Sequence, residues 1–316
     1  FLMTDLRLRR EGRSLLPDGE VLVIDEAHRL DDVATEHLAV RFDGDRLHSC
    51  ISAPLRSSAD GWLAATRFTF LMTLPEIDFM PWSARFDRVV LSGLKDLEVL
   101  ACDLFVELQG LGMNLESRRV PLRALLHSAN GERLANLLAE LCMACEETSD
   151  SIALLCREYE EKFDQNAPPE LVRLAHGTGR LAQDLEFLSA CESDDWVFLA
   201  ETEPSGLVAR PVDNAAALQD ELFSEYKTVV VTSASLQVDS SFHFFKRRTG
   251  LVENTDEFDF PSPFEFESQT FIGLVSQGPE PGSPDYVREM APSLVDLAAG
   301  MGGRMMLLTT SHRRVE

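Results

Sequence analysis

The apolar positions of this chain follow two patterns. Residues 21–30 (VLVIDEAHRL) open with an apolar run after a Pro-Asp-Gly turn and continue into two carboxylates and a histidine. Residues 227–236 (KTVVVTSASL) repeat the design with hydroxyl residues after the run, and residues 302–312 (GGRMMLLTTSH) repeat it again. Short, unbroken runs rich in β-branched residues predict buried strands of a parallel sheet.

The second pattern, apolar residues at helical spacing, fills most of the chain between the first two runs. It covers residues 85–112, 132–163 and 168–192, and the last of these opens with prolines that suit a helix start. Gly110 is placed to end the first helix as a C-cap. A further helix is expected over residues 286–301. The centre of the chain is therefore predicted to consist of long amphipathic helices.

Strands that end in small polar residues, interrupted by a helical block, predict an α/β fold. We expect residues 1–36 to begin a sheet domain and residues 37–192 to form an all-helical insertion. Residues 193–240 would return to the sheet through a β-hairpin at residues 195–214, and residues 241–316 would start a second α/β unit. Ligands of open α/β sheets bind beyond the C-terminal ends of the strands, so the candidate chemistry lies there.

The acidic pair Asp25 and Glu26, followed by His28, has the chemistry of a nucleotide-hydrolysing site. An aspartate at a strand end can hold Mg²⁺ through its water shell, and a second carboxylate can orient and deprotonate an attacking water. The alternative is a strand followed by a helix whose acidic first turn is favoured by the helix dipole. The order Asp-Glu-Ala-His directly after the apolar run favours the catalytic interpretation.

The net charge limits where nucleic acid could bind. A formal charge of −24 argues against a surface that coats DNA, because such surfaces are usually basic. Any path for DNA would be a narrow basic stripe. Its candidates are Arg247, Arg248, Arg304, Arg313 and Arg314. No apolar run approaches the ~20 residues of a membrane helix, so no membrane partner is expected.

The cysteines carry one pattern that invites a metal site. Cys142 and Cys145 form a C-x-x-C pair. Such a pair can bind a metal, but these two lie one turn apart in a helical apolar pattern, which favours core positions over ligands. Scattered thiols in a chain without an export signal favour a reducing, cytoplasmic location.

Several segments resemble one family. LLPDGEVLVIDEAHRLDDVATEHL resembles the DEAH-box segment of superfamily 2 DNA helicases of the DinG and XPD (iron–sulfur helicase) type. LFSEYKTVVVTSASL is similar to the family's third motif, with Ser235 in place of its second threonine, and GGRMMLLTTSHRRVE resembles its fourth. SSFHFFKRRTGL and FPSPFEFESQTFIGLV resemble segments between those two motifs. The matches keep the family's order, which is more specific than the DEAH box alone.

The resemblance implies a RecA-like, P-loop-NTPase fold for the sheet parts, which would be parts of two motor domains, with an arch-like domain as the helical insertion. Asp25 would coordinate the Mg²⁺ of bound ATP, and Glu26 would activate water at the γ-phosphate. His28 would link the nucleotide site to the neighbouring motor domain. Thr232 and Ser233 would couple hydrolysis to strand separation.

The resemblance also implies DNA contacts. Thr310 and Ser311 would lie on the second motor domain near the DNA backbone. Arg247 and Arg248 are candidates for the DNA path from the charge argument alone. Each hydroxyl pair that follows a predicted strand has a simpler alternative, in which it only caps the strand end.

Some parts of the family pattern are missing. No G-x-x-x-x-G-K-[ST] P-loop stands in this chain, because none of its lysines follows a glycine. By the resemblance, the P-loop and the cluster-binding cysteines would lie upstream and the late arginine motifs downstream. An iron–sulfur cluster is therefore expected only in a longer parent, with ligands other than Cys142 and Cys145.

We therefore expect the middle of a monomeric, ATP-dependent DNA helicase that moves 5′ to 3′ on single-stranded and forked duplex DNA. On its own the segment should bind ATP weakly and hydrolyse it negligibly. One alternative is a truncated, inactive paralogue that binds DNA or protein. Another is a helicase fused to an exonuclease.

Overall fold

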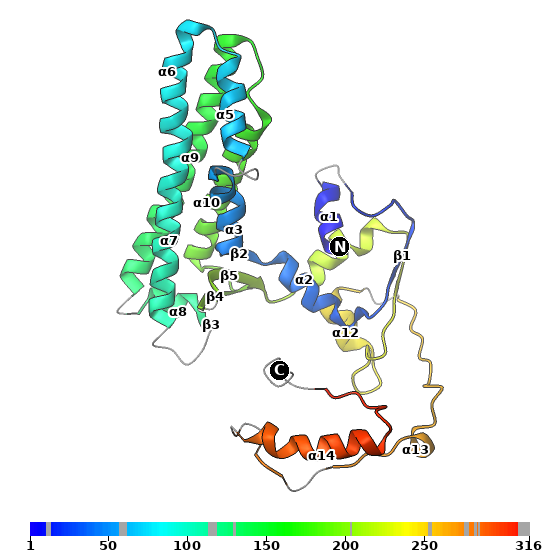
Figure 1. Ribbon diagram of the computed structural model, residues 1–316. Coiled ribbons are helices and arrows are strands. Elements are labelled where there is room, and N and C mark those ends of the chain that lie inside the picture. The colour runs from blue at the N-terminus through cyan, green and yellow to red at the C-terminus, as the bar shows by residue number, and fades with distance from the viewer. Residues whose placement is uncertain are drawn as a thin grey trace. The chain divides into compact units, whose positions relative to one another are not determined.

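The computed structural model describes residues 1–10, 14–56, 62–112, 119–128, 131–202, 204–251, 255–274, 278–280, 283 and 285–308. The chain divides into two compact units, Phe1–Asp256 and Glu257–Glu316. Helices and two small sheets make up the first unit (Figure 1). None of the helices in the described ranges is both long and apolar enough to cross a membrane.

A two-stranded parallel sheet joins the two ends of the first unit's sequence. It consists of β1 (Val21–Ile24) and β6 (Thr228–Val231), with Val21 opposite Thr228 and Ile24 opposite Val231. Both strands coincide with the apolar runs, so the predicted parallel pairing is confirmed here.

One face of this sheet packs against helices. They are α1 (Leu2–Arg10), α2 (Leu30–Leu38) and α11 (Ala215–Glu221), followed by the short η4 (Phe223–Glu225). The buried side chains of this small core are Met3, Leu6, Leu30, Ala34, Leu218 and Leu222, with Leu22 and Ile24 of β1 packed against them. Partly buried and exposed residues alternate along both strands, so the described residues cover only this face of the sheet. The expectation that both strands are buried is therefore wrong for the other face.

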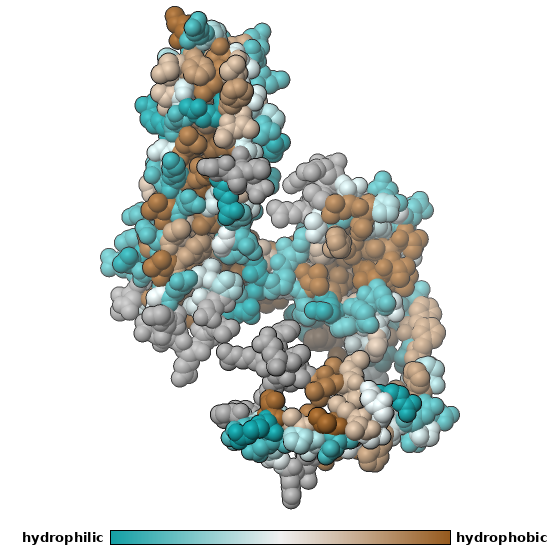
Figure 2. Space-filling model, viewed as in Figure 1, coloured by the Kyte–Doolittle hydropathy of each residue, from teal (hydrophilic) through white to brown (hydrophobic). Residues whose placement is uncertain are grey.

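The other face of the sheet exposes apolar side chains. Val21, Val23 and Val230 are 59%, 63% and 46% exposed. Figure 2 shows a broad apolar area over the part of the molecule where Figure 1 places β1 and α1.

A helical arm (residues 44–190) leaves the sheet after α2. Its long helices are α7 (Gly93–Gly112), α9 (Gly131–Phe163) and α10 (Pro169–Ala190), and its shorter segments are α3 (Gly44–Leu47), η2 (His48–Ser52), α4 (Ala53–Leu55), α5 (Trp62–Met72), α6 (Glu76–Phe86), η3 (Asp87–Ser92) and α8 (Leu122–Leu126). α9 packs along both α7 and α10 (Figure 1). The long helices predicted from the apolar spacing are confirmed. The expected C-cap at Gly110 is wrong, because helical backbone continues to Gly112.

A four-stranded antiparallel sheet lies at the base of the arm. Its order is β2 (Val40–Asp43), β5 (Ser205–Pro211), β4 (Trp196–Thr202) and β3 (Arg119–Pro121). The predicted hairpin is confirmed as β4 and β5. However, β2 and β3 fall within residues 37–192, so the expectation of an all-helical insertion is wrong on this point.

The antiparallel sheet and the arm share one hydrophobic core. The strand side chains in it are Phe42, Phe198, Ala200, Leu207 and Ala209. Gly206 lets β2 and β5 approach closely, because a Cβ there would meet the carbonyl oxygen of Phe42 at 3.0 Å. The sheet is therefore packed as part of the arm.

The second unit contains α13 (Phe266–Gln269) and α14 (Tyr286–Gly300), which confirms the helix expected over residues 286–301. A strand is expected over residues 302–312. Residues 304–308 form no strand and pair with none in the described part of the chain, so the prediction is wrong for them. The end of that segment, residues 309–312, lies outside the described residues.

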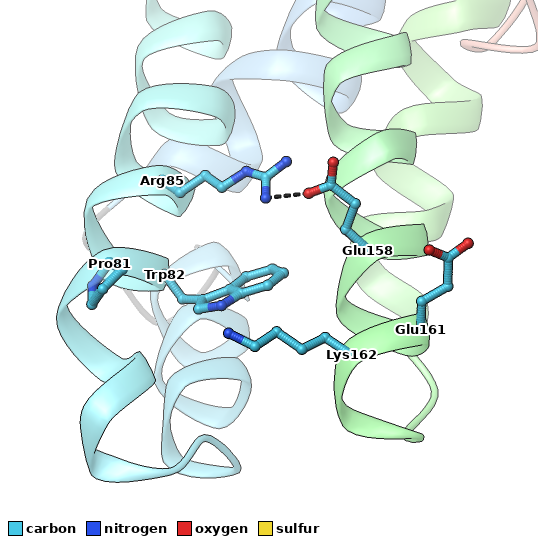
Figure 3. A pocket seen from close by; sticks show the side chains of 6 residues that line it. All are labelled: Pro81, Trp82, Arg85, Glu158, Glu161 and Lys162. Atoms are coloured by element: carbon cyan, nitrogen blue, oxygen red, sulfur yellow. Dashed lines mark ion pairs between the residues drawn. The ribbon is translucent and has the colours of Figure 1, made fainter.

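An aromatic cluster fixes α6 to α9 in the arm. Trp82 is 6% exposed, and its ring centroid lies 5.4–6.0 Å from those of Phe70, Tyr159 and Phe163. Arg85 and Lys162 lie on either side of the indole, beside a hollow of about 510 Å³ (Figure 3). Arg85 pairs with Glu158, and Lys162 pairs with Asp78. The cations at this hollow are thus neutralised within the arm.

The C-x-x-C pair lies on α9, as its helical spacing predicted. Cys145 is fully buried, while Cys142 is half-buried and donates its thiol to the carbonyl oxygen of Ala182 at 3.4 Å. Burial, together with the nearby thiols of Cys142 and Cys50, raises the pKa of Cys145 to about 12. No group of three or more His, Cys, Asp or Glu side chains in the described ranges is placed to hold a metal ion.

Replacing Trp82 by alanine should destabilise the arm by about 3–5 kcal/mol, because the cavity would lie inside the aromatic cluster. Urea denaturation followed by circular dichroism measures the change in the free energy of unfolding. Met80→Ala on the same helix is the matched control, since Met80 is 72% exposed and its loss should change stability by less than about 0.5 kcal/mol. Equal effects of the two substitutions would contradict this packing.

At pH 8, a thiol with a pKa of about 12 is roughly 10⁻⁴ ionised, so Cys145 should resist alkylation. Exposed Cys102 should react with iodoacetamide first, and Cys145 only after urea is added. Because burial raises the thiol pKa, raising the pH should increase the labelling of Cys145. Mass spectrometry of the labelled peptides measures both rates, and equal rates without urea would disprove the buried position.

Candidate functional site

The candidate site lies at the C-terminal edge of the parallel sheet. Because Ile24 pairs with Val231, the residues that follow them, Asp25 and Thr232, come side by side. The backbone N–H of Thr232 donates to Ile24 O at 2.9 Å, and the N–H of Ala27 donates to Thr232 O at 3.0 Å. The two predicted motifs are thereby joined through their main chains.

A strained turn presents the carboxylates. Glu26 has a left-handed backbone (φ 52°), which costs a non-glycine residue about 1 kcal/mol or more, and such strain is often found at functional sites. Its N–H donates to Asp25 Oδ1 at 2.9 Å. After this turn the chain enters the short helix η1 (Ala27–Arg29) and then α2. Both carboxylates remain exposed to solvent.

Three side chains of the two motifs form a hydrogen-bonded triangle. The Ser233 hydroxyl donates to Glu26 Oε2 at 3.1 Å and lies 2.8 Å from His28 Nδ1. When the Ser233 hydroxyl donates to Glu26, its oxygen is left to accept from His28, which requires the tautomer with a proton on Nδ1. His28 Nδ1 also lies 3.2 Å from Glu26 Oε2. The carboxylate, the imidazole and the hydroxyl are therefore linked in one hydrogen-bonded group.

A hollow of about 480 Å³ borders the acidic pair. It is lined by α1, the end of β1, η1 and α2, including Thr4, Asp25, Glu26 and Arg29. The sequence interpretation missed the contribution of α1 and Arg29 to this wall. The only signal for α1 was its apolar spacing (Leu2, Met3 and Leu6), which predicts a packed helix and says nothing of a site.

The acidic pair fits a magnesium ion better than a transition metal. Carboxylate oxygens are hard ligands, and Mg²⁺ usually takes one or two of them while keeping waters and phosphate oxygens. Asp25 supplies such a carboxylate at the mouth of the hollow, with Glu26 beside it. The arrangement can thus bind a metal–phosphate group and hold a water molecule near Glu26.

The arginine candidates differ in their surroundings. Arg247 and Arg248 lie on α12 (His243–Thr249), where Arg247 is exposed and Arg248 donates Nε to Asp31 Oδ2 at 2.8 Å. α12 ends at Gly250 (φ 74°), where a Cβ would lie 2.0 Å from the carbonyl oxygen of Ala215. Only glycine fits there, so α12 is fixed against the start of α11.

The remaining candidates belong to the second unit. Arg304 is exposed. Thr310, Ser311, Arg313 and Arg314 lie outside the described residues, so their predicted roles stay predictions.

No known protein-family model matches this chain. Nearly the whole chain aligns with two bacterial proteins. It is 26% identical over 329 residues to the 3′-5′ exonuclease DinG of Bacillus subtilis (strain 168), an alignment that covers 97% of this chain and 35% of DinG. It is 22% identical over 319 residues to the ATP-dependent DNA helicase YoaA of Escherichia coli (strain K12), covering 99% of this chain and 43% of YoaA.

The chain therefore spans less than half the length of either relative. Conservation of this extent across nearly all of the chain establishes distant homology, and the resemblance inferred from the motifs is confirmed at that level.

Proposed function

We propose that this chain, a distant homologue of DinG and YoaA, forms part of the motor of an ATP-dependent DNA helicase. The observation that carries the proposal is the hydrogen-bonded triangle of Glu26, His28 and Ser233 at the ends of two parallel strands. Two motifs distant in sequence meet there beside a hollow lined by carboxylates. Structural residues that merely cap strands would have no reason to share one hydrogen-bond network at a strained turn.

In the proposed mechanism Asp25 would hold the Mg²⁺ that accompanies ATP, and that ion would neutralise part of the phosphate charge. Glu26 accepts a proton from the water that attacks the γ-phosphate. Its carboxylate is aimed by the left-handed turn and by the Ser233 hydroxyl. None of the lysines in this sequence follows a glycine, so the sequence contains no P-loop motif. We therefore assign phosphate binding to a P-loop outside this sequence.

We propose that Thr232 and Ser233 couple hydrolysis to movement on DNA. When the charge on Glu26 changes during proton transfer, the Ser233 hydroxyl and His28 must rearrange, because all three share hydrogen bonds. Thr232 takes part in the same rearrangement, because its main chain is hydrogen-bonded to Ile24 and to Ala27. His28 faces the neighbouring motor domain in this proposal.

The DNA-binding part of the proposal rests on fewer observations. Arg247 is exposed on α12, in a chain whose overall charge is strongly negative, and it can reach a phosphate without breaking a described ion pair. Thr310, Ser311 and the helical arm would complete the path for a single strand. Unwinding of forked duplexes, 5′ to 3′ movement and a monomeric state are proposals for the full-length protein.

A second candidate is a truncated, inactive paralogue that binds DNA or protein through the arm. A nuclease function, which the name of the Bacillus relative includes, is not proposed for this segment, because the alignment covers only 35% of that protein.

Glu26→Gln in the full-length protein should lower the kcat of DNA-stimulated ATP hydrolysis by about 10²–10⁴-fold, because glutamine keeps the shape and removes the base. The KM for ATP should change little, since glutamine leaves Asp25 and the hollow in place. A coupled assay of ATP turnover with and without single-stranded DNA measures both quantities.

Glu20→Gln is the matched control. Glu20 is an exposed glutamate paired with Lys227 at the opposite end of the same two strands, so its loss should leave turnover unchanged. Wild-type turnover in Glu26→Gln would refute the assigned base. A wild-type protein that binds DNA without hydrolysing ATP would favour the inactive paralogue.

A further inference from the structure

The carboxylate of Asp31, in the first turn of α2, is held by side chains from two distant segments. Arg248 of α12 donates to Oδ2 through Nε at 2.8 Å and also through Nη2. Asn214, at the start of α11, donates Nδ2 to Oδ1 at 2.8 Å. The Asp31 side chain is only 16% exposed, so these charge-assisted bonds are better shielded than those of a surface pair.

Asn214 ties α2 to the chain that returns from the arm. It is fully buried, and its Nδ2 also faces Thr35 Oγ1 at 2.6 Å and the carbonyl oxygen of Asp31 at 3.2 Å. The reverse amide orientation would point its oxygen at a carboxylate and a carbonyl, which fixes the orientation. Pro211, the last residue of β5, lies only three positions earlier, so the arm sheet connects directly to this contact.

The far end of α2 is held by the arm sheet as well. Glu36 accepts a hydrogen bond from Arg210 Nε of β5 at 3.0 Å and pairs with Arg41 of β2. Both ends of α2 are therefore bonded to the segments that close the arm. A shift of that sheet would displace α2 as a rigid element.

α12 reaches the candidate site by packing in addition to its ion pair. Phe245 of α12 forms a small buried cluster with Leu236 and Ala27. Ala27 is 1% exposed and lies between Glu26 and His28 in the turn. The helix that carries Arg248 thus shares a buried cluster with the turn, and through Asp31 it is bonded to the helix that follows the turn.

We infer that Asp31 is a positioning residue that holds the Glu26–His28 turn in register with Ser233 by linking α2 to Asn214 and Arg248. The inference rests on the proposed ATP hydrolysis and adds to it a route by which the arm and α12 act on the site. It also assigns Arg248 to this contact and leaves Arg247 as the DNA candidate of α12.

The test uses the full-length protein with Asp31→Asn, Arg248→Met and the double variant. Each single change should lower the kcat of DNA-stimulated ATP hydrolysis about 10-fold, because a small displacement of a catalytic group is enough for such a loss. The KM for ATP and the affinity for single-stranded DNA should stay within about 2-fold. The double variant should be no worse than either single, because both remove one contact.

Asp32→Asn is the matched control, since it removes the same charge from the same turn at an exposed position. Wild-type kcat in Asp31→Asn, a 10-fold loss in Asp32→Asn, or additive losses in the double variant would overturn the inference and leave the proposed function intact. A wild-type protein without ATP turnover would overturn the proposed function first.

A second measurement does not depend on turnover. Hydrogen exchange of the peptide that covers residues 24–30 should speed up in Asp31→Asn and Arg248→Met and stay unchanged in Asp32→Asn. The main-chain bond from Ala27 to Thr232 reports on this turn. Unchanged exchange, or an equal rise throughout α1 and α11, would refute the positioning role, because the first shows no link and the second shows general destabilisation.

Discussion

The parallel pairing of β1 with β6 is the contact on which the candidate site depends, and it joins segments separated by the whole helical arm. Closing so long a loop directly would be entropically unfavourable. The antiparallel pairing of β2 with β5 brings the two ends of the arm together. With the arm closed in this way, only the connections from β1 to β2 and from β5 to β6 separate the two parallel strands. The antiparallel sheet therefore shortens the loop whose closure brings Glu26 and Ser233 together.

Much of this architecture follows from periodicity. The unbroken apolar runs specify β1 and β6, and helical spacing specifies α9 and α10, because burial of one face decides both. β2 and β3 were not predicted. Their sequences, Val-Arg-Phe-Asp and Arg-Val-Pro, are too short and mix polar with apolar residues too much to show a period. Their strand character comes from partners far along the chain, which no local pattern contains.

The candidate site likewise has a part that local sequence predicts and a part that it does not. Asp25, Glu26 and His28 could be identified from the order of residues after one strand, and Ser233 from the order after another. The contact of Arg248 with Asp31 could not, because it depends on how α12 docks, which Gly250 and Phe245 decide. In sequence, an arginine in Lys-Arg-Arg has the same character whether it faces a phosphate or a carboxylate of its own chain.

Internal pairing also explains how an acidic chain could still serve a polyanion. Several arginines already face carboxylates within the first unit, among them Arg41, Arg46, Arg67, Arg85, Arg210 and Arg248. Those guanidinium groups could bind a phosphate only by leaving a partner whose negative charge would then repel the DNA. In the proposed motor, binding would therefore be restricted to arginines outside this network, such as Arg247. A narrow track of this kind would contact the DNA backbone at few points, which suits a proposed motor that releases and rebinds DNA in every cycle.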